Sequence, residues 1–319
     1  MTDILIYGAG AIGSFLGYLL SEIPGKNAAE RKRIENVALL GRAGHISAIK
    51  EQGLHVDLGE TREVLFFRHC FSSLNELKAS DCHPRLVIVS VKTYSLPDLS
   101  RELKESGLLE ERFKESLFIL LMNGMGNREV FLKSGLDPAR LQEGITSLGV
   151  LLAGEGRVEL KGRGKTVLQN KIGREDRQFL EKRFSEKGFE IKFSPDFQRQ
   201  QFLKLLVNAA INPVTALTRR QNGVVLHPAL KSTVERVVAE ALAVAAAEGL
   251  AISEEEARGL VFSVAEKTAA NTSSMLQDVL RGKKTEIEAI NGYIVKQSKK
   301  HGIAVPVNEA LYALAKIAS

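Results

Sequence analysis

Three glycines near the start of the chain have the spacing of a nucleotide-binding turn. The motif G-x-G-x-x-G is formed by Gly8, Ala9, Gly10, Ala11, Ile12 and Gly13. The first glycine permits a tight turn, the second lets the backbone approach a pyrophosphate, and the third lets helix and strand pack closely. The motif follows an apolar strand, Met1–Gly8, and precedes a helical segment, Ala11–Leu20. This context favours dinucleotide binding over a glycine-rich turn without a ligand.

The end of the second apolar run bears on the choice between NADH and NADPH. Val37–Leu40 is followed by Gly41 and Arg42, and no carboxylate occurs in this stretch. An NAD site normally places an acidic residue here to accept from the ribose 2′-hydroxyl. A guanidinium can instead pair with a 2′-phosphate. The sequence therefore favours NADPH, and a solvated surface arginine is the alternative interpretation of Arg42.

A lysine and two asparagines recur at four-residue intervals in a helical segment that begins at Gln198. At about 100° per residue, Lys204, Asn208 and Asn212 lie within roughly 80° of one helix face. Asparagine is a poor helix former, so its presence on a merely solvated face is unexpected. This face could form the wall of a binding site, or it could hold a snorkelling lysine with two capping or core amides. Pro213 predicts that the helix kinks or ends beside Asn212.

Two further groups of residues give weaker signals. The polar stretches 271–278 and 284–288 contain Ser273 and Thr285 as candidate helix N-caps, and Glu286 and Glu288 suit a first helical turn. Each cysteine is adjacent to a histidine, in the pairs His69-Cys70 and Cys82-His83. Zinc sites usually use ligand pairs separated by two to four residues, so we expect reduced cysteines and no metal.

Composition and charge limit the class of protein. The chain has 319 residues, of which 44% are hydrophobic and 26% charged, with a formal net charge of +6. Basic residues are interleaved with acids and there is no tryptophan, which disfavours a nucleic-acid partner and suits a small anionic ligand. No apolar stretch is long enough to span a membrane, and the N-terminus lacks a basic region followed by an apolar one. We therefore expect a cytoplasmic protein without membrane contact.

The order of apolar and helical segments predicts two domains. Apolar runs alternate with helix-compatible segments through residues 1–195, an α/β pattern with a largely parallel sheet typical of a Rossmann-type dinucleotide-binding domain. Residues 196–319 are helical almost throughout, with periodic segments at 202–211, 232–247, 254–269 and 286–297. The polar segment Pro24–Glu35 is expected to be an exposed loop. The all-α C-terminal domain could carry a homodimer interface, although periodicity alone does not separate core from partner contact.

In this order, these features resemble the ketopantoate reductase (2-dehydropantoate 2-reductase) family over nearly the whole chain. The resemblance rests on six segments: Gly8–Gly13, Val91-Lys92-Thr93, Asn123-Gly124-Met125-Gly126, Lys204–Pro213, Ser273–Asp278 and Thr285-Glu286-Ile287. It implies an N-terminal Rossmann domain, a helical C-terminal domain and an active site in the cleft between them. The segments that match least are Pro24–Glu35 and the stretch from Gly144 to Gly156.

The resemblance also implies roles for individual residues. Lys92 and Asn123 would contact the nicotinamide end of NADPH or the nearby substrate, and Lys204 would donate the proton. Glu286 would lie near the cofactor ribose and help to orient Lys204. The ketopantoate would be held by Asn208, Asn212, Asn222 and Ser274. An ammonium near the carbonyl oxygen can stabilise the negative charge that hydride transfer creates there and supply the proton.

Three functions stay open at the level of sequence. The leading one is NADPH-dependent reduction of 2-dehydropantoate to (R)-pantoate, in the pantothenate route to coenzyme A. The second is a reductase of the same fold that acts on another 2-keto acid or keto compound. The third is a regulatory module that binds the cofactor without turnover, which Lys204 and the polar C-terminal segments disfavour.

Overall fold

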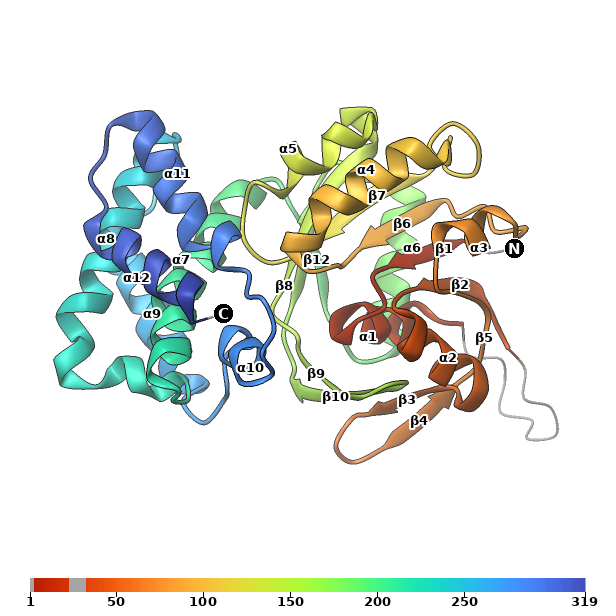
Figure 1. Ribbon diagram of the computed structural model, residues 1–319, viewed down its shortest axis with the longest axis horizontal. Helices are drawn as coiled ribbons and strands as arrows, with labels where there is room; N and C mark the ends of the chain where they lie inside the picture. The colour runs from red at the N-terminus through yellow and green to blue at the C-terminus, as the bar shows by residue number, and fades with distance from the viewer. Residues whose placement is uncertain (1–2, 23–32, 319) are drawn as a thin grey trace. The chain divides into compact units, whose positions relative to one another are not determined.

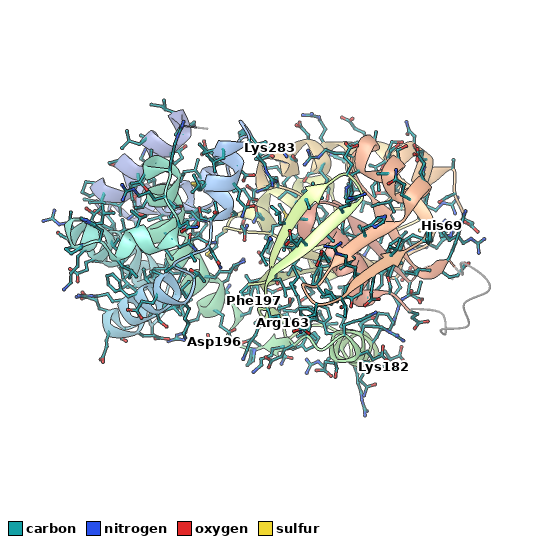
Figure 2. The ribbon with its side chains drawn as sticks, turned by 90° about the horizontal axis from the view of Figure 1, so that it is seen from below. His69, Arg163, Lys182, Asp196, Phe197 and Lys283 are labelled. Carbon is teal, nitrogen blue, oxygen red and sulfur yellow. The ribbon has the colours of Figure 1, made fainter. Side chains whose placement is uncertain are left out.

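The computed structural model describes residues 3–22 and 33–318. The chain divides into two compact units, which are described separately below. Unit 1 contains residues 1–122 and 128–195, and unit 2 contains residues 123–127 and 196–319. Asp196 and Phe197, labelled in Figure 2, mark the start of the long helix α7 (Phe197–Thr218) in unit 2.

The main sheet of unit 1 has eight strands in the order β12-β11-β8-β7-β6-β1-β2-β5 (Figure 1). Neighbouring strands are parallel throughout except β11 and β8, so the expected α/β fold with a largely parallel sheet is confirmed. The strands are β1 (Ile4–Tyr7), β2 (Ile34–Leu40), β5 (Phe67–Phe71), β6 (Leu86–Val89), β7 (Leu117–Leu121), β8 (Leu141–Thr146), β11 (Thr166–Gln169) and β12 (Ile191–Ser194). Every residue of β1 and of β6 is buried, as expected for parallel strands covered on both faces.

Helices cover both faces of this sheet. Ile4 and Ile6 of β1 belong to a core that also contains Phe15, from α1 (Ala11–Leu20), and Phe184, from α6 (Arg174–Glu186). Leu5 and Tyr7 belong to a second core with residues of α3 (Leu74–Lys78) and α4 (Leu96–Ser106). The alternation follows from the two-residue period of a strand. Among the described residues this unit also contains α2 (Ala43–Gln52) and α5 (Asn127–Phe131), apart from Asn127, which belongs to unit 2.

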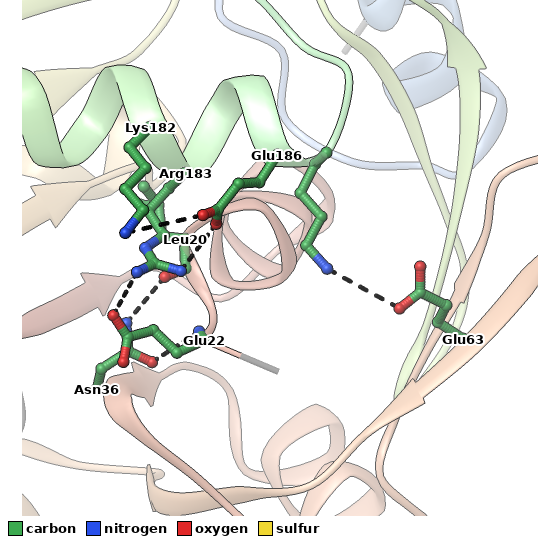
Figure 3. Close-up of polar contacts among 8 residues, drawn as sticks. Leu20, Glu22, Asn36, Glu63, Lys182, Arg183 and Glu186 are labelled. Carbon is green, nitrogen blue, oxygen red and sulfur yellow. Dashed lines mark hydrogen bonds and ion pairs between the residues drawn. The ribbon is translucent and has the colours of Figure 1, made fainter. Parts of the chain in front are cut away.

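Polar contacts tie α6 to the neighbouring end of α1. Arg183 forms ion pairs with Glu22 and with Glu186, and the Asn36 side chain donates to the carbonyl of Leu20 (Figure 3). Asn36 lies in β2, which begins at Ile34.

The expected loop Pro24–Glu35 is wrong at its end, because Ile34 and Glu35 belong to β2 and Ile34 is buried. Residues 24–32 of that loop lie outside the described residues.

A second, four-stranded sheet in unit 1 was not distinguished by the sequence. Its order is β4-β3-β10-β9, formed by β3 (Leu54–Asp57), β4 (Arg62–Leu65), β9 (Gly149–Gly154) and β10 (Arg157–Gly162). The apolar run Val64–Phe67 is divided between the two sheets. β4 ends at Leu65 in the small sheet, and β5 begins at Phe67 in the large one. Apolar periodicity identifies a strand but carries no information about the sheet that the strand joins.

Unit 2 is helical, as expected. Besides α7, it contains α8 (Lys231–Ala247), α9 (Glu254–Lys267), α10 (Ser274–Leu280), α11 (Asn291–His301) and α12 (Pro306–Ile317). Helix α7 contacts α8, α9, α10 and α12 and so forms the centre of the unit. The expected helix from Glu286 is wrong at its start, because residues Ile287–Ala289 form a 3-10 turn and α11 begins only at Asn291. Within the described residues no helix is long and apolar enough to cross a membrane.

Candidate active site

The glycine turn of unit 1 is shaped for close packing at two positions and for open space at a third. Gly8 has φ +108°, and a Cβ there would lie 2.7 Å from Cγ1 of Val91. A Cβ on Gly13 would overlap the carbonyl oxygen of Gly8. A Cβ on Gly10 would meet nothing nearer than 4.0 Å. Gly8 and Gly13 therefore permit the tight turn, while Gly10 leaves room above the backbone.

The start of α1 faces this turn with unpaired backbone donors. The first helical hydrogen bond runs from the Ser14 N–H to the carbonyl of Gly10, at 2.9 Å. The N–H groups of Ala11, Ile12 and Gly13 therefore have no acceptor within the helix, and no acidic residue lies in its first turn. Open space at Gly10, free N–H groups and the positive end of the helix dipole together fit the pyrophosphate of a dinucleotide.

The end of β2 is held against the glycine turn, which brings Arg42 to the same edge of the sheet. The N–H groups of Gly8 and Ala9 both donate to the carbonyl of Leu40, at 2.9 Å. A Cβ on Gly41 would lie 3.0 Å from that of Ala9. Arg42 follows as the N-cap residue of α2 and is exposed. Its guanidinium forms no ion pair within the described part of the chain, so it can pair with a ligand phosphate.

Lys92 also lies on this edge. Ser90, just after β6, donates from Oγ to the carbonyl of Gly8 at 3.0 Å, and its N–H bonds the carbonyl of Tyr7. Lys92 follows two residues later as the N-cap residue of the 3-10 turn Thr93–Ser95. The structure thus brings Lys92 and Arg42 to the glycine turn from two neighbours of β1. The sequence did not single out Ser90, whose hydroxyl fixes the first glycine.

In unit 2, Asn123 links Lys204 to Glu286. The Lys204 Nζ donates to Oδ1 of Asn123 at 3.0 Å, and Nδ2 of Asn123 donates to Oε2 of Glu286 at 3.0 Å. An ammonium only donates and a carboxylate only accepts, so these partners determine the orientation of the amide. Burial lowers the pKa of the Lys204 ammonium to about 8, and the Glu286 carboxylate opposes part of that shift.

The backbone around Asn123 is bound to the residues that follow Glu286. The Met125 N–H donates to the carbonyl of Ala289 at 2.9 Å, and the Asn127 side chain donates to the carbonyl of Asn123. Gly124 has φ +74°, and a Cβ there would overlap the carbonyl of Ala289. A glycine is required at this close approach. These contacts explain why residues 123–127 group with unit 2, and they bring Asn123 to Glu286.

Helix α7, which carries Lys204, Asn208 and Asn212, does not end at Pro213. It continues to Thr218, so of the two outcomes expected beside Asn212, a kink or an end, the end is wrong. A proline lacks the N–H that would bond the carbonyl four residues earlier, here that of Ala209. The side chain of Asn291 donates to this carbonyl at 3.2 Å, and Asn291 is fully buried. The freed acceptor is therefore satisfied from α11, and the helix continues.

The proposed substrate residues are distributed over three segments around α7. Asn208 is half-buried, one turn from Lys204, and Asn212 is buried. Ser274, the first residue of α10, is exposed. Its neighbour Ser273 caps that helix through the Leu276 N–H, as the sequence predicted, and shares a 2.6 Å hydrogen bond with Thr215 of α7. This hydroxyl pair fixes the start of α10 beside the helix that carries Asn212.

Of the two polar atoms in the Asn222 side-chain amide, the nitrogen has a hydrogen-bond partner and the oxygen has none within the described residues. Its Nδ2 donates to Oγ1 of Thr268 at 3.0 Å, and its backbone N–H donates to the carbonyl of Asn271. Its Oδ1 is buried and has no hydrogen-bond partner within the described residues. An unpaired buried acceptor is costly, by about 1–3 kcal/mol, and so is rarely left without a partner. A donor group of a bound ligand, such as a hydroxyl, would satisfy it.

Neither cysteine has the features of a reactive or metal-binding group. Cys70 and Cys82 are both buried and neither forms a disulfide, and burial raises the pKa of the Cys70 thiol to about 12. Across residues 3–22 and 33–318, no three His, Cys, Asp or Glu side chains gather closely enough to hold a metal ion.

Comparisons with known proteins identify close sequence and structural relatives. The family model described as ketopantoate reductase PanE/ApbA matches residues 4–172, and its C-terminal counterpart matches residues 196–319. A Pyrococcus horikoshii protein named 2-dehydropantoate 2-reductase is 33% identical over 318 residues, covering 98% of this chain and 96% of the relative. A Halobacterium salinarum protein of the same name is 31% identical over 322 residues, covering 99% and 98%.

Solved structures with the same fold include two differently named enzymes. A PanE/ApbA family ketopantoate reductase from Ralstonia eutropha JMP134 superposes with a TM-score of 0.83 at 26% identity, covering 99% of this chain and 98% of that one. D-mandelate dehydrogenase, solved with NADH and anilino(oxo)acetate, superposes with a TM-score of 0.84 at 25% identity and the same coverage. The fold is therefore shared by enzymes that are named for different activities.

Proposed function

We propose that this chain reduces 2-dehydropantoate to (R)-pantoate with NADPH. The chain belongs to the ketopantoate reductase PanE/ApbA family of oxidoreductases, and the proposal starts from this membership. This reaction would serve pantothenate and coenzyme A synthesis. The hydrogen-bonded series Lys204, Asn123 and Glu286 is the single observation that most supports the proposal. It combines a proton donor, an orienting amide and a compensating negative charge in one place.

Lys204 is the proton donor of the proposed reaction. A reduced nicotinamide, when bound, supplies the hydride to the C2 carbonyl of the keto acid. The Lys204 ammonium then donates a proton to the carbonyl oxygen, on which negative charge develops. A pKa near 8 suits this role, because the group stays mostly protonated at neutral pH and releases its proton more readily than an ordinary lysine.

Asn123 and Glu286 control the position and charge of that lysine. Asn123 accepts one of the three ammonium hydrogens, which limits the directions in which the other two can point. Glu286 favours the protonated lysine through its negative charge and holds Asn123 in the orientation that accepts. We also place Asn123 and Glu286 at the cofactor, beside the nicotinamide and its ribose.

The substrate is proposed to bind to amide and hydroxyl groups of unit 2. Asn208 and Asn212 share the face of α7 with Lys204, and Asn222 and Ser274 come from the segments before α8 and at α10. Neutral groups can hold a carboxylate and hydroxyls without adding negative charge that would oppose hydride transfer. The unpaired Oδ1 of Asn222 is a ready acceptor for a substrate hydroxyl.

The cofactor is a nicotinamide dinucleotide, and we propose that it is NADPH. Residues Gly8 to Gly13 and the start of α1 would hold the pyrophosphate, and Lys92 would lie toward the nicotinamide. Arg42, without an ion-pair partner among the described residues, would pair with the 2′-phosphate. In this assignment residues 1–195 form the cofactor-binding domain and residues 196–319 the substrate domain, with Asn123 contributed from the first segment.

A second candidate function is the reduction of a different 2-keto acid. The nearly equal fit to a ketopantoate reductase and to D-mandelate dehydrogenase favours keeping it, because both share the fold of this chain. A regulatory module that binds the cofactor without turnover is the third.

The test compares NADPH oxidation with ketopantoate, pyruvate and phenylglyoxylate, each repeated with NADH. Fast turnover of ketopantoate with NADPH, and slow turnover of the other two acids, supports the proposal. Faster reduction of another keto acid supports the second function. Cofactor binding without reduction of any acid supports the third. The oligomeric state, for which a homodimer is our expectation, is measured independently by light scattering.

A further inference from the structure

A tight turn between β9 and β10 is fixed onto helix α2. Gly156 donates from its N–H to Nδ1 of His45 at 2.9 Å, and its carbonyl accepts from the N–H of His55 at 2.8 Å. Gly156 has φ +70°, and a Cβ there would lie 3.1 Å from that of Ala48. The turn is therefore held from α2 and from β3, and Glu155 immediately precedes the fixed glycine.

His45 holds this turn and the glycine-turn helix α1 at once. Its Nδ1 accepts from Gly156, so the ring hydrogen lies on Nε2 and is directed to Oγ of Ser14, 2.9 Å away. Ser14 directly follows the last glycine of the turn. Both ring nitrogens are used only in the neutral ring, and burial lowers the pKa of His45, which favours that form. His45 is thus a positioning residue between two parts of the proposed cofactor site.

The Glu155 carboxylate lies against the first turn of α2. A Cβ built on Gly44, the second residue of that helix, would overlap the carboxylate of Glu155. Glu155 is exposed, and no hydrogen bond or ion pair holds its carboxylate within the described residues. Arg42 caps the same helix end, and both charges are close enough to act on His45. The Glu155 carboxylate therefore lies at the first turn of α2, the helix that Arg42 caps.

The chemistry of this position distinguishes the two nicotinamide cofactors. In dinucleotide-binding folds, a carboxylate just after the second strand accepts from the ribose 2′-hydroxyl of NADH, whereas an arginine there accommodates the 2′-phosphate of NADPH. This chain holds both groups, but the carboxylate comes from the distant β9–β10 turn and not from the end of β2. The positive end of α2 attracts either the carboxylate or a ligand phosphate.

We propose that Glu155 is a specificity-determining residue that repels the 2′-phosphate of NADPH and accepts a hydrogen bond from the 2′-hydroxyl of NADH. It thereby reduces the affinity for NADPH relative to NADH that Arg42 provides. The proposal rests on the proposed cofactor site at Arg42. Gly44 is part of the arrangement, because a side chain at this position would displace the carboxylate from the helix start.

The first experiment measures binding of two cofactor fragments to the full chain by titration calorimetry. The fragments are 2′,5′-ADP and 5′-AMP, which differ only in the 2′-phosphate. Glu155→Gln should tighten 2′,5′-ADP by about 3- to 10-fold at low salt, because an exposed like charge is removed. Binding of 5′-AMP should stay equal or weaken. Glu60→Gln is the matched control, since Glu60 is an exposed carboxylate on the β3–β4 turn of the same small sheet.

The second variant moves the carboxylate without removing its charge. Gly44→Ala places a methyl group where the carboxylate lies, and an exposed glutamate side chain can swing away. It should shift the ratio of the two fragment affinities in the same direction as Glu155→Gln. In the Glu155→Gln background, Gly44→Ala should change the ratio of the two fragment affinities only slightly, because the side chain that it displaces no longer carries charge.

The outcomes separate this inference from the proposed function. Equal effects of Glu155→Gln and Glu60→Gln on the affinity ratio, or weaker 2′,5′-ADP binding in Glu155→Gln, would overturn the role of Glu155. Arg42→Ala tests the site itself and should weaken 2′,5′-ADP at least about tenfold without a comparable loss of 5′-AMP. If Arg42→Ala has no such effect, the 2′-phosphate site is misplaced, and the role of Glu155 falls with it.

Discussion

The ammonium of Lys204 and the amide of Asn123 are joined by a 3.0 Å hydrogen bond across 81 residues of sequence. The same amide donates a hydrogen bond to the Glu286 carboxylate, so the side chain of Asn123 connects the positive and the negative group of the candidate active site. Such a series can orient a proton donor and adjust its pKa at the same time.

Removing the ammonium should abolish most of the activity. We expect Lys204→Ala to lower kcat for ketopantoate reduction at least about a hundredfold, the usual size of general-acid catalysis. NADPH binding, measured by fluorescence, should change much less, because Arg42 and the glycine turn are intact. Lys231→Ala, at an exposed position on α8, is the control. A fully active Lys204→Ala enzyme would exclude Lys204 as the proton donor.

The reaction should slow in alkaline solution. The general acid must be protonated, and burial lowers the pKa of Lys204 to about 8. We therefore expect kcat/KM in the reductive direction to fall roughly tenfold per pH unit once the pH exceeds that value. The measurement is a pH profile with cofactor and substrate stability checked at each pH. A profile that stays flat to pH 10 would contradict this assignment.

Neutralising Glu286 should move the alkaline limb of the pH profile, the range in which kcat/KM falls as the pH rises. The Glu286 carboxylate raises the pKa of Lys204 against the larger effect of burial. Glu286→Gln keeps an oxygen that can accept from Asn123 but removes the charge, so the limb should shift to lower pH. The rate at neutral pH should fall as well, since less of the lysine is protonated. Loss of rate with an unmoved limb would indicate that Glu286 acts only on the ligands.

Asn291 and Pro213 should be coupled in stability. Asn291→Leu removes the donor to the Ala209 carbonyl, which Pro213 leaves without a helical partner, and should lower the free energy of unfolding by about 1–3 kcal/mol. Pro213→Ala restores an N–H that can bond this carbonyl. The loss from Asn291→Leu should then be smaller in the Pro213→Ala background. Some loss will persist, because Asn291 also donates to Asn308. Urea unfolding of the four proteins tests this cycle, and strict additivity would refute it.

Two glycines of the nucleotide turn should respond differently to alanine. A Cβ on Gly13 would overlap the backbone of Gly8, so Gly13→Ala should destabilise unit 1 by about 1–3 kcal/mol. A Cβ on Gly10 meets open space, so Gly10→Ala should leave the melting temperature nearly unchanged and weaken cofactor binding. Thermal unfolding and NADPH titration on both variants measure the two effects. A stable Gly13→Ala chain with normal cofactor affinity would contradict this view.

The sequence alone determined the features that depend on neighbouring residues. Apolar runs and glycine spacing identify β1, the turn and α1, because strand period, turn conformation and helix start are local properties. Helical periodicity likewise places Lys204, Asn208 and Asn212 on one face of α7. The resemblance to the reductase family added roles for residues such as Asn123 and Glu286, which spacing alone did not distinguish.

Only the tertiary structure decided which distant segments meet. Asn123 reaches Lys204 and Glu286 because Gly124 and Met125 pack on Ala289, and α7 continues past Pro213 because Asn291 supplies the missing donor. Glu155 lies at the start of α2, the helix that Arg42 caps, because His45 fixes the β9–β10 turn on α2. Each of these contacts depends on packing between elements far apart in the chain. No local propensity or periodicity encodes such a pairing, so it appears only once the chain is folded.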